Sequence, residues 1–342
     1  MGKFNAKNEE IASLKAKRTN DTEHVLVTGA AGFIGSNLCA HLVSGGNMVY
    51  GVDNFITGEK KSTARLLEEE NFRFFEIDIV SDDFLKKFSK LPLKKIFHLA
   101  CPTGVPNIKK LPEEMLMVSS IGTRNVMEVA KACGAKVVFS SSCEIYGQPE
   151  KFPQDENYAG NVDPVGPRSP YEEGKRFSES LIMMYVKKYG VDADIVRLFN
   201  GYGPGMRLED PRVIPRFLKS VFSNKKPVVY GDGNQTRTFL YVDDLVNGLV
   251  RVMESGSKGN VYNIGSVEQV SINELSEIMS EIVDWKGGVE HREHFIDDHC
   301  ARQPSIEKIR SLGWRKKITL RKGIEKTVEY FLNEQKNKIM NK

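Results

Sequence analysis

The chain has 342 residues, of which 40% are hydrophobic, so it can bury one large core or a core with a smaller lobe beside it. Its 49 basic and 45 acidic residues are well mixed, and the net charge of +4 gives no nucleic-acid footprint. No run approaches the roughly 20 apolar residues of a spanning helix, and the polar stretch 1–23 resembles neither a signal peptide nor an anchor. Five scattered cysteines without a CxxC pair favour reduced thiols and a cytoplasmic protein.

Short runs of β-branched and aromatic residues alternate with helical patterns up to residue 201. The predicted strands are HVLVTG (24–29), MVYGVD (48–53), FRFFEIDI (72–79), KIFHLA (95–100), KVVFSSS (136–142) and ADIVRLFN (193–200). Strands that alternate with helices predict right-handed βαβ units in a parallel sheet covered on both faces. The expected fold class is therefore α/β, with a doubly wound Rossmann sheet.

The rhythm changes after GYGPGMRLEDP. A helix over about 212–224, short strands VVYGDG and RTFLYV, further helices and the C-terminal segment TLRKGIEKTVEYFLNEQ follow. They predict a smaller C-terminal α/β lobe that is interleaved with the last part of the sheet. We expect a polar extension at 1–23, a nucleotide-binding domain at 24–203, and a second lobe at 204–342.

The first motif is the glycine run TGAAGFIG. Gly29, Gly32 and Gly35 lie between the first strand and a helix, in a tight turn where backbone amides can meet a pyrophosphate. Asp53 ends the next strand 18 residues after Gly35, where a ribose 2′-hydroxyl would be held, and no arginine directly follows it. The pattern favours NAD over NADP as the cofactor. The alternative to nucleotide binding is a tight turn without a ligand. Asp78 either accepts from the adenine amino group or caps the next helix.

The second motif is SPYEEGKRFSE. Ser169 as N-cap and Glu172 at N3 predict the start of a helix with a capping box. Tyr171 and Lys175 then share one helix face, where the ammonium and a cationic nicotinamide can lower the pKa of the phenol. Such a phenolate can take a proton from a substrate hydroxyl, and the serines at 140–142 supply a hydroxyl nearby. The alternative is a first-turn tyrosine beside a surface lysine.

Together these motifs resemble the extended short-chain dehydrogenase/reductase family, which acts on nucleotide sugars, over about residues 24–335. Longer stretches are similar to the UDP-glucuronate decarboxylases, or UDP-xylose synthases: DNFITGEKK, HLACP, SSCEIYGQPE, VGPRSPYEEGKR, RLFNGYGP and YGDGNQTRTFLYVDDLVNGL. The resemblance implies oxidation of the sugar at C4 by NAD, loss of CO2 from the resulting β-keto acid, protonation at C5 and return of the hydride. It also implies a homodimer formed through helices at about 115–133 and 170–189.

The resemblance assigns roles to individual side chains. Ser142 positions the 4-hydroxyl, and Glu144 orients the ring or a proton-delivering water, unless it is a solvated loop carboxylate. Arg237 faces the substrate carboxylate or diphosphate, unless it forms an ordinary ion pair. The expected catalytic set is Ser142, Glu144, Tyr171, Lys175 and Arg237; the cofactor set is Gly29, Gly32, Phe33, Ile34, Gly35, Asp53, Asn54, Asp78, Ile79, Leu99, Ala100, Tyr171 and Lys175; the nucleotide-sugar set is Pro102, Glu144, Asn200, Arg212, Tyr230, Arg237 and Arg302.

Three departures from the decarboxylase pattern leave other functions open. Gly205 stands where GPRM has an arginine, with Arg207 nearby, Cys143 replaces a small hydroxyl residue, and the loop HLACPTGVPN differs from the usual HLASPASPPN-like form. A 4-epimerase would share the serine, tyrosine and lysine but has little use for Glu144. A 4,6-dehydratase would need an acid where Cys143 stands, and a non-catalytic NAD-binding scaffold would not keep Tyr171.

Two further features receive ordinary interpretations. His291, His294, His299 and Cys300 have loosely metal-like spacing, but we expect a polar strand and loop and no metal. Cys143 has no histidine base near it in the sequence, so we expect no nucleophile there, and His98 should pack or cap at a strand end.

Overall fold

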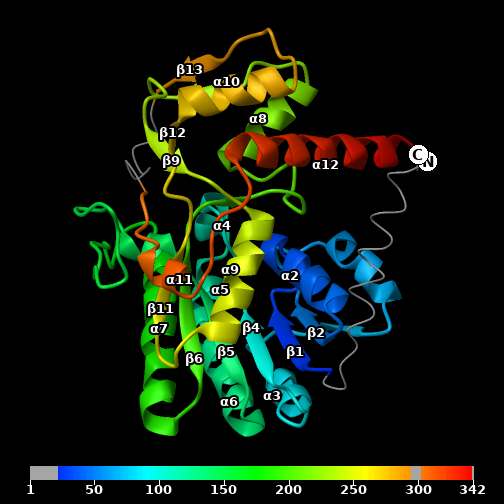
Figure 1. Cartoon of the computed structure of the whole chain (residues 1–342), viewed down its shortest axis with the longest axis vertical. Coiled ribbons are helices and arrows are strands. Elements are labelled where there is room, and N and C mark those ends of the chain that lie inside the picture. The colour runs from blue at the N-terminus through cyan, green and yellow to red at the C-terminus, as the bar shows by residue number, and fades with distance from the viewer. Residues whose placement is uncertain (1–21, 294–301, 341–342) are drawn as a thin grey trace.

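A seven-stranded parallel sheet forms the centre of the computed structural model, which describes residues 22–293 and 302–340 (Figure 1). The strand order is β11-β6-β5-β4-β1-β2-β3, with β1 His24–Thr28, β2 Met48–Asp53, β3 Phe72–Glu76, β4 Lys95–His98, β5 Lys136–Ser142, β6 Ala193–Leu198 and β11 Val261–Ile264. The order reverses between β1 and β4, the switch point at which open α/β sheets bind ligands. The six predicted strands are confirmed, but the short seventh strand, VYNI, was missed.

Helices cover both faces of the sheet. On one face α2 (Phe33–Ser44) packs against α9 (Val242–Ser255), and on the other α3 (Asp82–Phe88) and α7 (Ser169–Tyr189) pack against α6 (Thr123–Cys133). Because both faces are covered, every residue of β6 is buried. The remaining helices here are α4 Val105–Lys110, α5 Pro112–Met117, the 3-10 helices η1 Lys60–Ser62, η2 Ala64–Glu68 and η4 Cys143–Tyr146, and the π-helix η3 Val118–Gly122.

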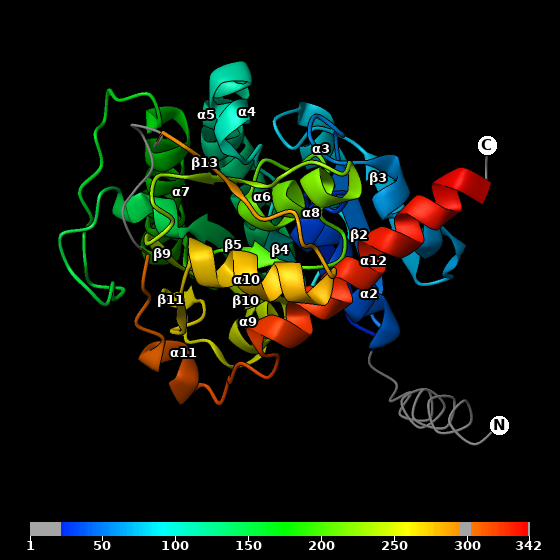
Figure 2. The same ribbon diagram turned by 90° about the horizontal axis from the view of Figure 1, so that it is seen from above.

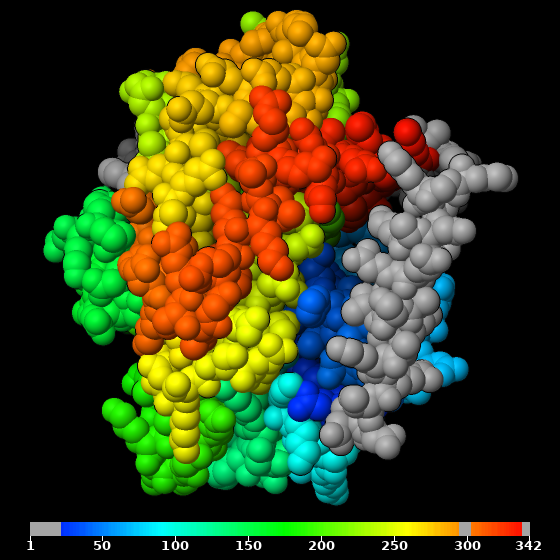
Figure 3. All heavy atoms as spheres, in the orientation of Figure 1, coloured from blue at the N-terminus to red at the C-terminus, as the bar shows by residue number. Residues whose placement is uncertain are grey.

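The later part of the chain forms a smaller lobe above the carboxyl edge of the sheet (Figures 1 and 2). It contains α8 Val213–Phe222, α10 Ile272–Ile282 and α12 Leu320–Met340, with strand pairs β7 Gly201–Tyr202 and β10 Leu240–Tyr241, β9 Thr236–Thr238 and β12 Gln269–Ser271, and β8 Val228–Tyr230 and β13 Glu290–Arg292. However, α9 and β11 also come from beyond residue 203 and pack into the sheet. The short helix α11 (Glu307–Ser311) lies against β11, and Figure 3 shows its segment beside α9.

None of the helices in the described part of the chain combines the length and the apolar character needed to cross a membrane.

The start of α7 differs from the prediction. Arg168, not Ser169, is the N-cap residue, and no side chain caps the helix, so the predicted capping box is wrong. The backbone amides of Tyr171 and Glu172 donate to the Arg168 carbonyl, which begins the helix one residue earlier. Glu172 accepts from Nε of Arg168 at 2.8 Å, so its carboxylate is used for an ion pair instead of a cap.

A buried histidine ties the strand ends to the helices below the site. Oγ1 of Thr28 accepts from the amides of Leu99 and Ala100, both at 3.2 Å, so its hydroxyl proton points to Nδ1 of His98 at 2.9 Å. Nε2 of His98 then donates to Oγ1 of Thr123 at 3.1 Å. Burial lowers the pKa of His98 to about 3, so the imidazole is neutral and packs, as predicted.

This histidine should make the stability of the fold sensitive to acid. Below its ordinary pKa of about 6.5 the unfolded chain binds a proton at His98 that the folded chain does not, so the free energy of unfolding falls as the pH decreases, by at most about 1.4 kcal/mol per pH unit. Urea unfolding between about pH 7.5 and 5 should show a steeper decline for the wild type than for His98→Asn. Parallel declines would show that the histidine is protonated equally in both states.

Candidate active site

The glycine turn leaves room only for backbone. Gly29 has φ +73°, and a Cβ there would lie 2.9 Å from the amide nitrogen of Ala100. A Cβ on Gly35 would lie 2.0 Å from the carbonyl oxygen of Gly29, so helix α2 can approach the strand end closely only with glycine. Helix α2 begins at Phe33 with Gly32 as N-cap and no side-chain cap. Its first backbone amides are therefore available for a pyrophosphate, as NAD requires.

The carboxylate of Asp53, the last residue of β2, is held by two backbone amides. Its Oδ2 accepts from the amide of Ala31 at 3.0 Å and its Oδ1 from the amide of Phe55 at 2.8 Å. Burial raises the pKa of this carboxyl, while the backbone hydrogen bonds oppose the rise. Each carboxylate oxygen has a second lone pair, so the fixed side chain can also accept from ribose hydroxyls. The residues present thus fit the adenosine half of NAD.

Ser81, not Asp78, is the N-cap residue of α3, and no side chain caps this helix, so the capping alternative is wrong. The adenine contact stays a prediction for Asp78. Its Oδ1 accepts from the amide of Val80 at 2.8 Å, which closes the turn before α3, and its Oδ2 accepts from Nδ2 of Asn54 at 2.9 Å. Ile79 is buried beside it. Together with Leu99, Ala100 and Ile34, these predicted cofactor residues occupy the strand ends and the helix start at the switch point.

Ser142 and Tyr171 lie close together, and the buried Lys175, one helical turn after Tyr171, contacts the strand end that carries Ser140. Ser142 ends β5 and hydrogen-bonds the phenol of Tyr171, whose pKa is raised by burial and lowered in part by this bond. Lys175 is 3% exposed and donates from Nζ to the carbonyl oxygen of Ser140 at 2.8 Å, and burial lowers its pKa. In the chain alone the pKa of Tyr171 is thus raised. The predicted lowering depends on the positive charge of bound nicotinamide.

Two thiols lie near the tyrosine, the half-buried Cys101 and the buried Cys143, and the sequence analysis missed the first of them. Cys101 follows β4, donates to the carbonyl oxygen of Pro102 at 3.3 Å, and contributes to the raised pKa of Tyr171. Burial raises the pKa of Cys101, and that of Cys143 to about 12. Protonated thiols are weak nucleophiles, which agrees with the expectation for Cys143. The signal for Cys101 was its position one residue beyond a predicted strand end.

Glu144 is not a solvated loop carboxylate. It lies in η4, and its Oε2 accepts from Nη2 of Arg302 at 3.1 Å and from Nη2 of Arg168. Burial alone would lower the pKa of each arginine, but both values are raised, because Glu144 together with Glu172 at Arg168, and Glu144 together with Cys143 at Arg302, outweighs the burial. The predicted site residue Arg302, only 4% exposed, therefore contacts Glu144.

Arg168 was missed by the sequence analysis. It forms ion pairs with both Glu144 and the buried Glu172. Together with Arg302, which pairs with Glu144, this makes a cluster of two guanidinium groups and two carboxylates. The available signal was its spacing of four residues from Glu172, which is typical of a helical ion pair.

The other predicted nucleotide-sugar residues lie after β6. Nδ2 of Asn200 donates to the carbonyl oxygen of Thr238 at 3.3 Å, which connects the sheet edge to the smaller lobe. Arg212 pairs with Asp210 at 2.7 Å, and its guanidinium lies 5.6 Å from the ring centre of Phe33. It is thus close to the pyrophosphate turn.

Tyr230 and Arg237 belong to the strands of the smaller lobe. The guanidinium of Arg216 lies 4.7 Å from the ring centre of Tyr230, on β8. Nη1 of Arg237, on β9, donates to the carbonyl oxygen of Thr236 at 2.9 Å. These contacts leave the predicted roles of both residues as predictions.

Gly205 occupies a position that excludes a larger residue. Its φ is +90°, and a Cβ would lie 2.7 Å from Nδ2 of Asn37. Arg207 forms an ion pair with Glu59 at 3.5 Å. An arginine at position 205 would therefore need a different local backbone.

Within residues 22–293 and 302–340, no cluster of three or more metal-ligating side chains occurs. Nδ1 of His291 bonds the carbonyl oxygen of Gly231 at 2.9 Å. The other three residues of the metal-like pattern, His294, His299 and Cys300, lie outside the described residues.

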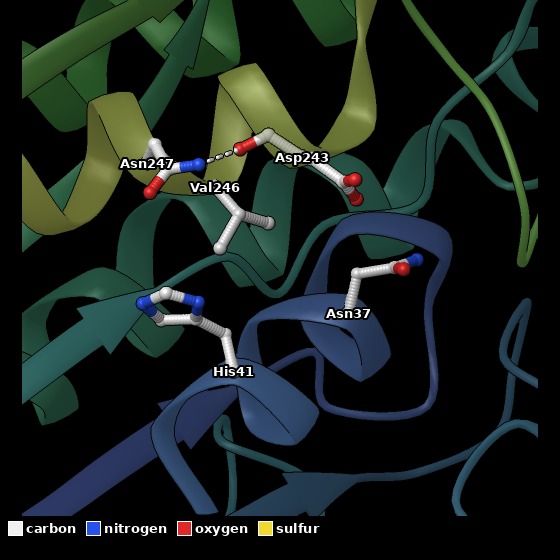
Figure 4. Close-up of a pocket in the computed structure, with 5 residues that line it drawn as sticks. All are labelled: Asn37, His41, Asp243, Val246 and Asn247. Atoms are coloured by element: carbon white, nitrogen blue, oxygen red, sulfur yellow. Dashed lines mark hydrogen bonds between the residues drawn. The ribbon is translucent and has the colours of Figure 1, made fainter. Parts of the chain in front are cut away.

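A separate hollow of about 240 Å³ lies between α2 and α9 (Figure 4). It is lined by Asn37, His41, Asp243, Val246 and Asn247, none of which belongs to the predicted site. Nδ2 of Asn247 donates to the backbone of Asp243, and burial lowers the pKa of His41. The hollow thus presents the neutral imidazole of His41 and the carboxyl group of Asp243, and neither group favours the binding of a phosphate.

Comparison with known proteins places the chain among enzymes of nucleotide sugars. The model of the NAD dependent epimerase/dehydratase family matches residues 25–265. The UDP-glucuronic acid decarboxylase 1 of Xenopus tropicalis is 38% identical over 97% of this chain and 78% of its own length, and that of Arabidopsis thaliana is 39% identical over 90% and 70%.

Two solved structures have the same fold. The UDP-glucose 4-epimerase of Thermotoga maritima with UDP-glucose superimposes with a TM-score of 0.84 and 29% identity, over 91% of this chain and 99% of that one. The UDP-glucuronic acid 4-epimerase of Bacillus cereus in complex with NAD gives 0.78 and 27% over the same shares.

Replacement of Tyr171 by phenylalanine should abolish sugar oxidation while NAD still binds. The variant loses the oxygen that accepts the substrate proton, so we expect single-turnover NADH formation to fall by at least about 100-fold. NAD affinity should change little, because the glycine turn and Asp53 are untouched. Tyr189→Phe, on the exposed end of the same helix, is the matched control. Full activity of Tyr171→Phe would assign the base elsewhere.

Proposed function

We propose, because the chain belongs to the NAD-dependent epimerase/dehydratase family and resembles UDP-glucuronic acid decarboxylases over most of its length, that it converts UDP-glucuronate to UDP-xylose and CO2. The observation that carries the proposal is the Glu144 carboxylate, held by two arginines beside Ser142 and Tyr171. This group gives the site an element that C4 oxidation alone does not need.

In the proposed reaction Tyr171 acts first as a base and later as an acid, and Glu144 acts only when C5 is protonated. NAD held at the glycine turn and Asp53 would supply the hydride acceptor and then the hydride donor at C4, so no second substrate would be consumed. Tyr171 takes the proton of the C4 hydroxyl, which Ser142 positions. The C5–C6 bond then breaks, CO2 leaves, and the electron pair stays in the C5–C4–O4 enolate. A water oriented by Glu144 protonates C5, and Tyr171 finally returns the O4 proton.

The site favours decarboxylation over the two related reactions. A 4-epimerase requires only proton and hydride transfer at C4, for which the arginine-bound carboxylate at Glu144 has no function. A 4,6-dehydratase must protonate a leaving hydroxyl at C6, and the thiol of Cys143, with a pKa of about 12, is a poor acid for that step. We assign recognition of the substrate carboxylate to Arg237, whose planar fork suits it.

The deciding experiment incubates the protein with UDP-glucuronate and NAD and follows the nucleotide sugars by mass spectrometry. A product lighter by one CO2, without net NADH, is expected. A product of unchanged mass but altered configuration would mean an epimerase, and loss of water would mean a dehydratase.

In the same assay, Glu144→Gln should reduce turnover by about 100-fold with little change in nucleotide affinity, because the variant cannot orient a proton-delivering water. The control Glu173→Gln removes a carboxylate of α7 that lies outside the charge cluster and pairs with Arg176, and it should behave like the wild type. Unchanged turnover of Glu144→Gln would remove its catalytic role.

We further propose a cytoplasmic homodimer. The described cysteines Cys39, Cys101, Cys133 and Cys143 are all free thiols, which supports a reducing compartment. Large apolar side chains are exposed on α5, η3 and α7, which pack together: Leu116, Met117, Ile121, Phe177 and Met184. Such a patch supports pairing with a second copy.

Phe177 provides a test of the dimer. It is 52% exposed on α7, so Phe177→Glu should place a charge in the interface and give a monomeric mass at micromolar concentration, against a dimeric mass for the wild type. Phe152→Glu changes a side chain that is 47% exposed outside this patch and should leave the mass unchanged. A monomeric wild type would refute the proposal.

A further inference from the structure

Arg302 holds both ends of the turn that carries Glu144. Its Nη2 donates to Oε2 of Glu144 at 3.1 Å, and its Nη1 donates to the carbonyl oxygen of Gly147 at 2.8 Å. Glu144 lies in η4 (Cys143–Tyr146), and Gly147 is its C-cap residue. The position of the Glu144 carboxylate therefore depends on where the chain places Arg302.

Gln154 holds the residues directly after Arg302. Its backbone amide donates to the carbonyl oxygen of Gln303 at 2.8 Å, and its carbonyl oxygen accepts from the amide of Ser305 at 2.7 Å. Its side-chain Oε1 accepts from the amide of Gln303 at 3.1 Å. Gln154 is fully buried, so these three hydrogen bonds have no competition from water.

Asn263, at the end region of β11, closes the connection. Tyr146 accepts from Nη1 of Arg197 at 3.0 Å and donates its own proton to Oδ1 of Asn263 at 2.8 Å. Nδ2 of Asn263 must then be the donor, to the carbonyl oxygens of Gln154 at 3.0 Å and of Ser305 at 3.2 Å. This assignment uses every polar atom of the side chain.

The contacts form a closed ring. It runs from Glu144 through Arg302 to residues 303–305, from there to Asn263, and through Tyr146 back along the chain to Glu144. Nε2 of Gln154 and Nε of Arg302 have no hydrogen-bond partner in this ring. The hydrogen bonds that the ring does make restrict its geometry, because a displacement breaks bonds between buried groups that water does not replace.

We propose that Gln154 and Asn263 are positioning residues that set Arg302 against Glu144 and thereby decide whether the 4-keto intermediate is completed to the pentose or escapes. The inference rests on the proposed decarboxylation. Hydride removal at C4 and loss of CO2 use Tyr171, Ser142 and Lys175. Ser142 touches the ring through its Oγ, which accepts from the backbone amide of Glu144 at 3.2 Å, but the side chains of Gln154 and Asn263 bond none of the three. Only protonation of C5 uses the carboxylate that the ring holds, and the hydride returns to C4 after it.

We predict a change in the fraction of turnovers that release the 4-keto sugar instead of the pentose product. When C5 protonation is slowed, the 4-keto sugar dissociates with C5 protonated by solvent, and its two electrons stay behind as NADH. Asn263→Asp keeps the side-chain shape but places an oxygen against two carbonyl oxygens, and Gln154→Met keeps the length but loses the acceptor. In both variants we expect the released fraction of 4-keto sugar to rise by about tenfold and first-turnover NADH formation to change by less than about threefold.

A second measurement reports on the ring without catalysis. Hydrogen exchange of the amides of Gln303 and Ser305 should be about tenfold faster in either variant than in the wild type. Lys151→Met is the matched control, because it breaks only a surface ion pair with Asp155 in the same loop. It should leave both exchange and the division of turnovers unchanged.

Several outcomes would overturn the inference. Unchanged exchange in both variants would show that the ring does not hold the segment. Faster exchange with an unchanged released fraction, or equal losses in both half-reactions, would reduce the residues to a structural role. If the wild type oxidises UDP-glucuronate but releases no CO2, the proposed function fails separately, and the exchange result still decides whether Gln154 and Asn263 fix Arg302.

Discussion

The ion pairs between Glu144 and the arginines at positions 168 and 302 are the constraint on which the site depends. Three segments far apart in the chain meet at one carboxylate: the end of β5, the start of α7 and the strand-like residues after the smaller lobe. Removing either arginine would leave a poorly hydrated carboxylate with less compensation, which is costly in a buried setting. The cluster therefore requires that the sheet, the catalytic helix and the returning chain be placed together before chemistry can occur.

The topology explains how this meeting is possible. The chain completes six strands of the sheet, leaves to form the smaller lobe, and returns with α9 and β11 to the same sheet. That return places Asn263 beside β6 and close to the turn after β5, where the hydroxyl of Tyr146 donates a hydrogen bond to it. Because the lobe is anchored in this way at several points, one hydrophobic core joins its helices to the sheet.

Local signals predicted what depends on local sequence. The six strands, the glycine turn and the positions of Tyr171 and Lys175 follow from β-branched runs, glycine spacing and helical periodicity, which all act over a few residues. By contrast, β11 has four residues and comes after the first elements of the smaller lobe have interrupted the sheet, so no βαβ rhythm marked it. The contacts of Glu144 with Arg168 and Arg302 were not predicted, because these arginines are 24 and 158 residues away and only the assembled fold brings them to the carboxylate. The capping box failed for a local reason, since the carboxylate of Glu172 pairs with Arg168 four residues earlier.

The burial that orders the site also makes its chemistry depend on the cofactor. Desolvation raises the pKa of Tyr171, lowers that of Lys175 and keeps both neighbouring thiols protonated. A phenol in this setting does not ionise on its own, so proton transfer to Tyr171 becomes favourable only when the positive nicotinamide lies beside it. The same dry environment strengthens every hydrogen bond of the Glu144 cluster. In its proposed role as the base, Tyr171 would thus depend on bound NAD, and the glycine turn proposed to bind the pyrophosphate of NAD lies more than 100 residues earlier in the chain.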